Sequence, residues 1–376
     1  MTLLAVLFWL SAILILYTHL GYPLALRALV ATRRRPTLEP GTWEELPRVS
    51  LIVAAHDEEE VIAAKVANAL ALDYPRERLE LIVASDGSGD ATAERARDAG
   101  ADLVLELPRG GKTAAQNAAA ERATGEILAF SDANSEWSVD ALRHLVEPFA
   151  DPSVAYACGQ VRFLDAEGDN REGAYWRYEM RVREMESALA GVTAGNGAIY
   201  AVRAAAYLPL EPSGSHDLSF PFALAKRGKR SLYVPWARAE EKMVPTLEGE
   251  FARKRRMMIG LWDIVVGERM ISPRGYSSLY AFEIASHRLL RYLSPLLHLV
   301  AFLANLLLLG QGWVYVVTYG VQVAAIAAAI LGGQFRRRPL LLARHYALST
   351  LSIAAGFWDR FRKGPPSTWE KAPGTR

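Results

Sequence analysis

Two long stretches of the chain carry no charged side chain, and they limit where the rest of it can fold. Residues 1–26 and 292–335 contain no Asp, Glu, Lys or Arg, and roughly 20 apolar residues are enough to cross the hydrocarbon core of a bilayer. We therefore predict a transmembrane helix over 1–30 and membrane-spanning structure over 292–335. A cleaved signal peptide is the weaker alternative at the N-terminus, because no basic segment precedes the apolar run.

The C-terminal apolar region has two parts of different character. Gly310-Gln311-Gly312 interrupts the uncharged stretch, which predicts a transmembrane hairpin with helices at 292–309 and 313–332. The next apolar run, 339–358, contains Arg344, and a charge in the middle of a bilayer is costly. We therefore favour an interfacial amphipathic helix there over a third C-terminal membrane helix.

Basic residues cluster beside these apolar segments, at 33–35, 253–256 and 336–338. Because the net charge is only +2, the composition gives no case for nucleic-acid binding, and we assign the clusters to the cytoplasmic face of a membrane. This assignment places the N-terminus outside and the residues that follow it inside. The single cysteine, Cys158, excludes an internal disulfide and suits a reducing compartment.

Strand-like and helix-like runs alternate in the middle of the chain, which predicts an α/β domain with a mostly parallel sheet and helices on both faces. Strands are predicted at 49–55, 79–84, 103–105 and 127–130, and helices at 58–72, 91–99 and 113–123. The predicted segments are a linker at 31–47, the α/β domain at 48–245, amphipathic interfacial helices at 246–291, and an interfacial or membrane helix with a basic tail at 336–376.

Acidic residues stand at the ends of two predicted strands, where open α/β sheets bind ligands. Asp86 follows one strand and Asp132 another, and two such ends suit a nucleotide and a divalent cation. Asp132 and Asn134 are two positions apart, so an extended loop would point both the same way, as oxygen ligands of a cation that bridges phosphates. The structural alternatives are a turn at Asp86-Gly87 and an Asx turn in which Asn134 caps a helix.

A glycine pair precedes the predicted helix at 113–123. The pattern lacks the first glycine of a phosphate-binding P-loop, because position 106 is Glu. A lysine at a helix N-terminus is unfavourable unless an anion binds nearby, so we predict that Lys112 contacts phosphate, with Asn117 on the same helix face. The alternative is that Gly110 and Gly111 only shape a turn.

Two further acidic positions begin predicted helices. Asp57 and Glu58 follow the first strand and are candidates for contact with the base or ribose of a nucleotide, although acidic residues also complement a helix dipole. Asp217, preceded by His216, stands immediately before a predicted helix at 218–227. It is either a simple N-cap or a general base that takes a proton from an acceptor hydroxyl.

The segment 253–262 predicts a basic amphipathic helix. The simpler interpretation is that this helix binds to a membrane surface. The alternative is that one of its arginines neutralises a leaving diphosphate while Trp262 offers a ring face to a sugar or lipid. The candidate arginines are Arg253, Arg255 and Arg256.

In this order along the chain, the motifs resemble those of membrane-bound, family-2 inverting glycosyltransferases, which have a Rossmann-like GT-A fold. The resemblance covers roughly residues 48–265. The matching segments are Ala54–Glu58, with Asp57 in place of the family's Asn; Ser85–Thr92; Gly111-Lys112 with Asn117; Asp132-Ala133-Asn134, with Asn134 in the second acidic place; Gly195–Tyr200; and His216-Asp217.

The resemblance implies roles for these residues. Nucleotide-sugar contacts are implied for Asp57, Glu58, Asp86, Lys112, Asn117 and Asp132, and ligation of Mg²⁺ or Mn²⁺ for Asp132 and Asn134. Asp217 is implied as the base. Contacts with the acceptor or the diphosphate are implied for Gly195, Asn196, Gly197, His216, Arg253, Arg255, Arg256 and Trp262.

The function implied is transfer of a sugar, with a UDP-sugar favoured as donor, to a lipid or lipid-linked saccharide in glycolipid or polysaccharide biosynthesis. The catalytic domain would lie on the cytoplasmic side of the membrane. The Gln-x-x-Arg-Trp motif of processive synthases is absent, which disfavours a long-chain synthase. That synthase, and a non-catalytic partner that binds nucleotide sugar, are the alternatives.

Overall fold

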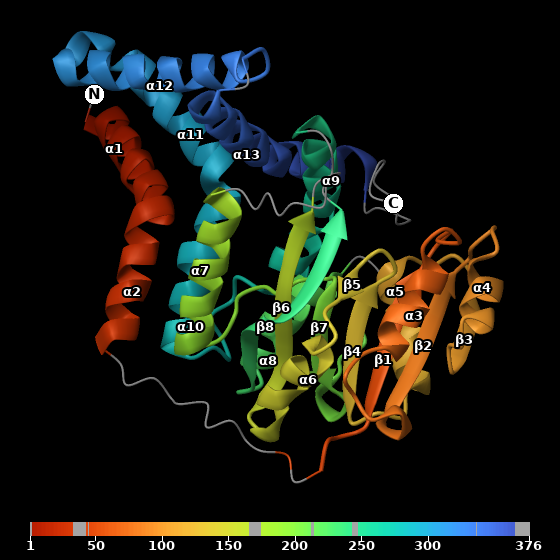
Figure 1. Ribbon diagram of the computed structural model, residues 1–376. Helices are drawn as coiled ribbons and strands as arrows, with labels where there is room; N and C mark the ends of the chain where they lie inside the picture. Colours follow the sequence, from red (N-terminus) through yellow and green to blue (C-terminus); the bar gives the residue numbers. More distant parts are fainter. Residues whose placement is uncertain are drawn as a thin grey trace. The chain divides into compact units, whose positions relative to one another are not determined.

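The computed structural model describes residues 2–32, 43, 45–164, 174–211, 214–242, 247–335 and 337–364 (Figure 1). The predicted linker and the end of the basic tail lie mostly outside the described residues. The chain divides into two compact units. We call them the helical unit (Met1–Ala28, Thr246–Trp262 and Glu283–Gly364) and the sheet unit (Leu29–Pro245, Asp263–Phe282 and Pro365–Arg376).

The sheet unit is built on one mixed sheet with the strand order β3-β2-β1-β4-β7-β6-β8-β5 (Figure 1). Strands β3, β2, β1 and β4 are parallel, β7 is antiparallel to both β4 and β6, and β8 is parallel to β6 and antiparallel to β5. The strands are β1 (Val49–Ala55), β2 (Leu79–Asp86), β3 (Leu103–Leu107), β4 (Ile127–Asp132), β5 (Glu136–Trp137), β6 (Val154–Leu164), β7 (Ile199–Arg203) and β8 (Arg230–Lys242).

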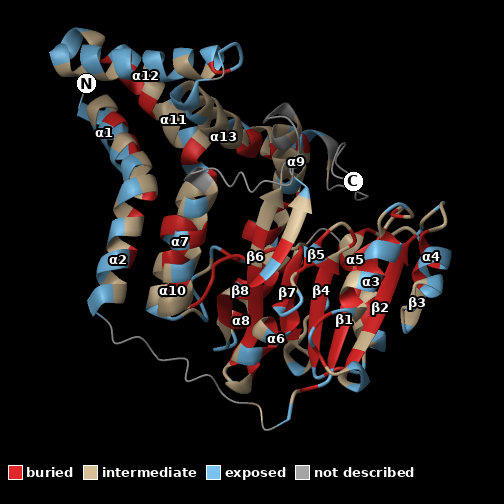
Figure 2. Ribbon diagram, viewed as in Figure 1, coloured by how far each residue is buried: buried red, intermediate tan, exposed pale blue. Residues whose placement is uncertain are grey.

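Helices cover both faces of this sheet, because its strands bury apolar side chains on both sides (Figure 2). Leu51 and Val53 of β1 belong to one core cluster, and Ile52 between them belongs to the other. The helices of the unit are α3 (Ile62–Leu70), α4 (Thr92–Asp98), α5 (Lys112–Arg122), α6 (Ala141–Val146), α7 (Ala174–Leu189), α8 (His216–Ala225) and α10 (Ser278–Glu283). Short 3₁₀ or π turns lie at Arg76–Arg78, Glu147–Ala150, Ala204–Ala206 and Asp263–Gly267.

The predicted α/β domain is confirmed, with differences at the ends of its elements. The first strand has the predicted bounds, whereas β2 and β4 extend to Asp86 and Asp132. The helix predicted from residue 58 begins at Ile62, because the amides of Val61 and Ile62 close a turn on the Glu58 carbonyl. Strands β5 to β8 were not predicted, since they pair with segments far away in sequence.

The helical unit contains α1 (Thr2–Leu16), a π turn at Tyr17–Gly21, α2 (Tyr22–Thr32), α9 (Leu247–Ile259), a π turn at Ile284–Leu289, α11 (Leu290–Leu307), a 3₁₀ turn at Leu309–Gln311, α12 (Trp313–Leu331) and α13 (Arg338–Lys363). Four helical stretches are long and apolar enough to cross a membrane, namely Thr2–Thr32, Ser278–Leu307, Trp313–Leu331 and Arg338–Arg362. The break predicted at Gly310–Gly312 is present. Whether α13 crosses the bilayer or lies in its interface stays a prediction.

Polar groups join the helices of this unit. The Tyr346 hydroxyl of α13 lies 3.2 Å from His19 Nε2 and 3.1 Å from His298 Nε2. His298 Nδ1 lies 2.8 Å from the Ser294 carbonyl, which fixes Nδ1 as the protonated nitrogen and Nε2 as an acceptor. Such hydrogen bonds between helices hold membrane segments together where no water competes.

Candidate active site

The predicted acidic residues gather at the carboxyl ends of neighbouring parallel strands. In the register of the sheet, Ala55 of β1 faces Ser85 of β2, and Ala54 faces Asp132 of β4. Asp86 and Asp132 are the last residues of their strands. The sheet therefore brings both acidic ends to the edge where the fold class binds ligands.

Asp86 holds the loop that leads into α5. Its side chain is buried, and its Oδ1 accepts hydrogen bonds from the amides of Gly110 (2.6 Å) and Gly111 (3.0 Å). Arg109, which the sequence analysis did not single out, donates from Nη1 to Asp86 Oδ2 at 2.8 Å. Gly87 has φ +59°, and a Cβ on it would lie 2.8 Å from the Arg109 amide nitrogen. Asp86 thus shapes this loop. Its predicted contact with the nucleotide sugar needs one of these partners to move.

Asp57 and Glu58 join the first acidic loop to the second. Asp57 Oδ1 accepts from the Gly89 amide at 2.7 Å, and the Glu58 amide donates to Thr92 Oγ1 at 2.7 Å. Glu58 is buried, whereas the Asp57 side chain is 42% exposed. Of this pair, Asp57 is therefore the one open to a ligand.

Lys112, the first residue of α5, forms an ion pair with Asp132. Its Nζ also donates to the Gly197 carbonyl at 3.4 Å. Burial lowers the pKa of Lys112, but the carboxylates of Asp132 and Asp217 outweigh this effect, so the pKa is raised and the side chain is a cation. The predicted phosphate contact and the predicted metal ligand thus lie together, each about one quarter exposed.

The loop Gly195–Ala198 connects Lys112 to Asp217. The Gly195 amide donates to the Asp217 carbonyl at 2.6 Å. A Cβ on Gly197 would lie 3.5 Å from Lys112 Nζ and 4.0 Å from the carboxyl carbon of Asp217. Asn196 Nδ2 donates to the Gly159 carbonyl at 2.6 Å, which anchors the loop on β6. Lys112, Asp132 and Asp217 therefore form one site around this loop.

Asp217 lies in the first turn of α8 and is not its N-cap, because Ser215 occupies that position. The Ser215 hydroxyl bonds to the Asp217 carboxylate. A helix N-terminus favours a negative side chain in its first turn. Among the described residues, Asp217 is thus a carboxylate positioned beside Lys112 with one hydroxyl partner.

The His216 side chain is buried among aromatic rings, and its predicted contact with the acceptor or the diphosphate stays a prediction. Its ring is buried against Phe130, Tyr207 and Phe220, with Nδ1 2.7 Å from the Tyr200 hydroxyl. Burial, aided by the charge of Lys112, lowers its pKa to about 3, so the ring is neutral. His216 fixes the start of α8 from the core side.

Asn117 also points away from Lys112. Its Oδ1 accepts from the Tyr207 hydroxyl at 2.7 Å, and its Nδ2 donates to the Leu210 carbonyl at 2.8 Å. Five residues along a helix correspond to a rotation of about 140° from the starting face, so the predicted shared face was wrong. Asn117 instead anchors the segment before α8.

Lys65 is a buried basic residue that the sequence analysis missed. Its Nζ donates to the Ser135 carbonyl at 2.7 Å and lies 5.2 Å from the centre of the Trp137 ring. Burial lowers its pKa to about 7, against the opposing effect of Asp132. A signal was available, because Lys65 stands within the apolar stripe of α3 formed by Ile62, Val66 and Ala69.

The metal-ligand set is small. Asp132 offers a carboxylate and Asn134 an amide oxygen, and the turn between β4 and β5 closes through the Ser135 amide and the Asp132 carbonyl. No helix begins at Ser138, so the alternative in which Asn134 caps such a helix is wrong. Within the described ranges, no three His, Cys, Asp or Glu side chains gather to hold a metal. The set fits a cation that draws its other ligands from a bound donor.

The basic helix α9 and Trp262 belong to the helical unit. Arg255 donates from Nε and Nη2 to the carboxylate of Asp359 in α13, at 2.5 and 2.7 Å. The Trp262 ring packs on Phe357 and Phe361. Arg255 and Trp262 therefore have partners within their own unit, and the diphosphate contact predicted for Arg253, Arg255, Arg256 and Trp262 stays a prediction.

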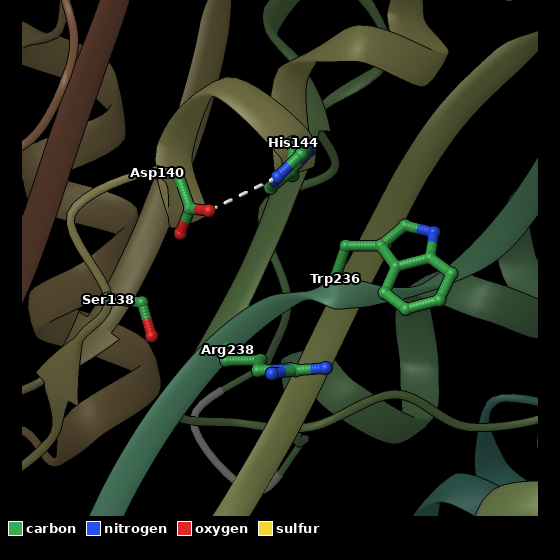
Figure 3. Close-up of a pocket in the computed structure, with 5 residues that line it drawn as sticks. All are labelled: Ser138, Asp140, His144, Trp236 and Arg238. Carbon is green, nitrogen blue, oxygen red and sulfur yellow. Dashed lines mark ion pairs between the residues drawn. The ribbon is translucent and has the colours of Figure 1, made fainter.

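A separate shallow pocket of about 600 Å³ lies between β8 and the start of α6 (Figure 3). His144 and Asp140 form an ion pair at 3.4 Å on one side of it, and the exposed Trp236 ring lies on the other. Its lining residues are Ser138, Asp140, His144, Trp236 and Arg238. The pocket shares no residue with the acidic site.

The comparisons with known proteins point to glycosyl transferases. Residues 50–208 match the family described as glycosyl transferase family 2. The chain is 29% identical over 266 residues to a beta-monoglucosyldiacylglycerol synthase of Trichormus variabilis, covering 62% of this chain and 54% of that protein. It thus spans about half the length of the curated relatives it matches. It is also 30% identical over 124 residues to a poly-beta-1,6-N-acetyl-D-glucosamine synthase of Staphylococcus aureus, covering 32% and 30% of the two chains.

One solved structure shares the fold over nearly the whole chain. It is the mannosyltransferase PcManGT from Pyrobaculum calidifontis in complex with GDP-Man and Mn²⁺. The TM-score is 0.74 at 21% identity, and the match covers 94% of this chain and 99% of that one. The GT-A architecture expected from the sequence is confirmed.

Proposed function

We propose that the chain, whose residues 50–208 match glycosyl transferase family 2, moves one sugar, or a few, from a nucleoside diphosphate sugar to a membrane-associated acceptor, with inversion at the anomeric carbon. The observation that carries this proposal is the grouping of Lys112, Asp132 and Asp217 around the loop Gly195–Ala198. A base, an acidic metal ligand and a cation for phosphate are the parts that such a transfer needs.

Each part has a role in a single displacement. Asp217 takes the proton of an acceptor hydroxyl, whose oxygen attacks the anomeric carbon from the face opposite the diphosphate. The bond from that carbon to the diphosphate oxygen breaks, and the leaving group departs with the electron pair. Lys112 supplies positive charge for it, and Asp57 is the open carboxylate for the nucleoside. Asp132 and Asn134 would hold a divalent cation, Mg²⁺ or Mn²⁺, which neutralises diphosphate charge when bound.

The acceptor is proposed to be a lipid or a lipid-linked saccharide, and the donor a UDP-sugar. Helices long and apolar enough to span a membrane flank the sheet unit in sequence. A relative matched over 62% of this chain is named as the synthase of a glycolipid. Both support an acceptor that stays in the bilayer.

The first test is nucleotide binding by the full-length protein in detergent. Calorimetry with UDP, GDP and CDP, each with and without Mn²⁺, is expected to show metal-dependent binding of UDP. Asp132→Ala should abolish it. Asp140→Ala, which removes an exposed carboxylate outside the site, is the matched control and should bind as the wild type does. Folded protein that binds none of the three nucleotides would contradict the proposal.

A second arm separates binding from chemistry. Asp217→Asn keeps the shape of the side chain and removes the base, so we expect turnover to fall by about 10²- to 10⁴-fold, the range typical of a lost general base. Nucleotide affinity should stay within a few-fold of wild type. Near-normal turnover of Asp217→Asn would rule out this residue as the base.

A further inference from the structure

Asp132, the carboxylate expected to bind a metal, already has a cation as its partner. The ammonium group of Lys112 pairs with Asp132 Oδ1. Lys65 of α3, 3% exposed, is a second basic side chain that interacts electrostatically with Asp132. Because like charges repel, Lys112 beside Asp132 opposes the binding of a divalent ion there.

The protein alone offers few ligands for a divalent ion. Asp132 and Asn134 supply one carboxylate and one amide, and the described part of the chain adds no cluster of three metal-ligating side chains. Mg²⁺ commonly takes only one or two protein carboxylates and completes its shell with water and substrate phosphates. The missing negative charge and the missing ligands can both come from a diphosphate.

A second position, beside Gly197, is available to the ammonium group of Lys112. Its Nζ already lies 3.4 Å from the Gly197 carbonyl. The space over Gly197 lies between that Nζ and the Asp217 carboxylate, and the missing side chain keeps it open. A lysine ammonium on a flexible four-carbon stem crosses such a distance without movement of the backbone.

We propose that Lys112 occupies the cation position beside Asp132 until the donor arrives, so that a divalent cation binds only together with a nucleoside diphosphate, and Lys112 then moves toward Gly197 and Asp217. The proposal rests on the proposed function, because it takes a nucleoside diphosphate as the ligand. Lys112 then prevents a metal ion from binding at Asp132 before the donor is present.

The test measures Mn²⁺ binding directly, from the electron paramagnetic resonance signal of free Mn²⁺ titrated with full-length protein in detergent. Wild-type protein should bind Mn²⁺ weakly by itself and about tenfold more tightly or better with UDP. Lys112→Met should bind Mn²⁺ without nucleotide about tenfold more tightly than wild type, a gain of about 1.4 kcal/mol. Lys112→Arg, which keeps the charge, should behave as the wild type does.

Lys65→Met is the matched control, because it removes the other basic side chain that interacts with Asp132 but leaves the ion pair of Lys112 in place. A small change in Mn²⁺ affinity is expected for it. The same gain in Lys65→Met as in Lys112→Met would overturn the proposal, since general electrostatics would then explain both. Adding Asp132→Ala to Lys112→Met should remove the gain, which locates the ion at Asp132.

Two other results would also overturn the proposal. One is Mn²⁺ binding by Lys112→Met no tighter than by wild type, and the other is wild-type protein that binds Mn²⁺ equally well with and without UDP. Failure of the proposed function has a different signature, because wild-type protein would then bind no nucleotide at any Mn²⁺ concentration. The nucleotide-free comparison of the variants does not depend on that outcome.

Discussion

Lys65 is a buried basic side chain behind the active site, and its charge has a cost. The folded-state pKa of Lys65, lowered by burial to about 7, lies below the ordinary lysine value of 10.5. The folded protein therefore disfavours protonated Lys65. The loss of stability is complete below about pH 7 and disappears as the pH rises toward the unfolded value.

We expect Lys65→Met to stabilise the protein at pH 7, because folding disfavours protonation of the buried lysine, whereas methionine has no proton to lose. A pKa shift of one unit corresponds to about 1.4 kcal/mol, so the gain should reach a few kcal/mol, reduced by the lost bond to the Ser135 carbonyl. Thermal unfolding in detergent at pH 7 and pH 10 checks this. The gain must shrink at pH 10, and an equal gain at both pH values would refute a charge effect.

At the scale of elements, the loop Gly195–Ala198 is hydrogen-bonded to two parts of the site. It bonds to the Asp217 carbonyl at its start, and its end receives the Trp137 indole N–H at 3.0 Å. Trp137 in turn is held through its backbone by Asn68 of α3. Asp217 of α8, the proposed base, and Trp137, which follows Asp132 in the chain, are therefore both bonded to the loop Gly195–Ala198.

Gly195 is required in that loop, because a Cβ there would lie 1.8 Å from the Tyr156 hydroxyl oxygen. Tyr156 is buried and stacked on Tyr200 and Phe220, so it cannot move aside. Gly195→Ala should cost about 1–3 kcal/mol of stability, as overpacking does, and should lower turnover more than nucleotide affinity through displacement of Asp217. Thermal unfolding and steady-state kinetics measure the two effects.

The companion variants show whether this clash is the cause. Tyr156→Phe added to Gly195→Ala removes the clashing oxygen and should restore part of the stability. Gly267→Ala is the control, because a Cβ there meets no atom within 4 Å. If Gly195→Ala were as stable and active as Gly267→Ala, the tight packing of the loop would have no energetic weight.

At the scale of the whole molecule, the contacts of α13 bear on which side of the membrane its end lies. The end of α13 packs on α9 through Arg255–Asp359 and through Trp262 with Phe361. Only residues 243–246 separate β8 from α9. On the other side of α9, Trp262 is followed directly by Asp263 of the sheet unit, so no segment long enough to cross a hydrocarbon core of about 30 Å lies between them. We therefore expect the end of α13 to lie on the same side of the membrane as the sheet unit.

Labelling of single introduced cysteines tests this arrangement. The native thiol should not compete, because burial raises the pKa of Cys158 to about 11. In right-side-out vesicles, an impermeant maleimide should label Thr2→Cys at once, but Asp98→Cys in α4 and Arg362→Cys in α13 only after permeabilisation. Labelling of Asp98→Cys and Arg362→Cys from opposite sides would refute the shared side.

The sequence by itself determined the elements whose signals are local. Uncharged runs predicted apolar helices, continuous apolar runs predicted the parallel strands β1 to β4, and the motifs that contain Asp86, Lys112, Asp132 and Asp217 resembled those of one family. These inferences succeed because hydrophobic periodicity and the position of a residue at a strand end depend on neighbours along the chain.

Only the tertiary structure decided where individual side chains point. His216 lies beside Asp217 in sequence but is packed into an aromatic core, Asn117 bonds to the segment before α8, and Arg255 is held by Asp359. Lys65 is joined to Ser135, seventy positions away. Each of these directions is set by partners that only folding brings close. The physical reason is that a buried polar group must find its hydrogen bonds wherever the fold supplies them.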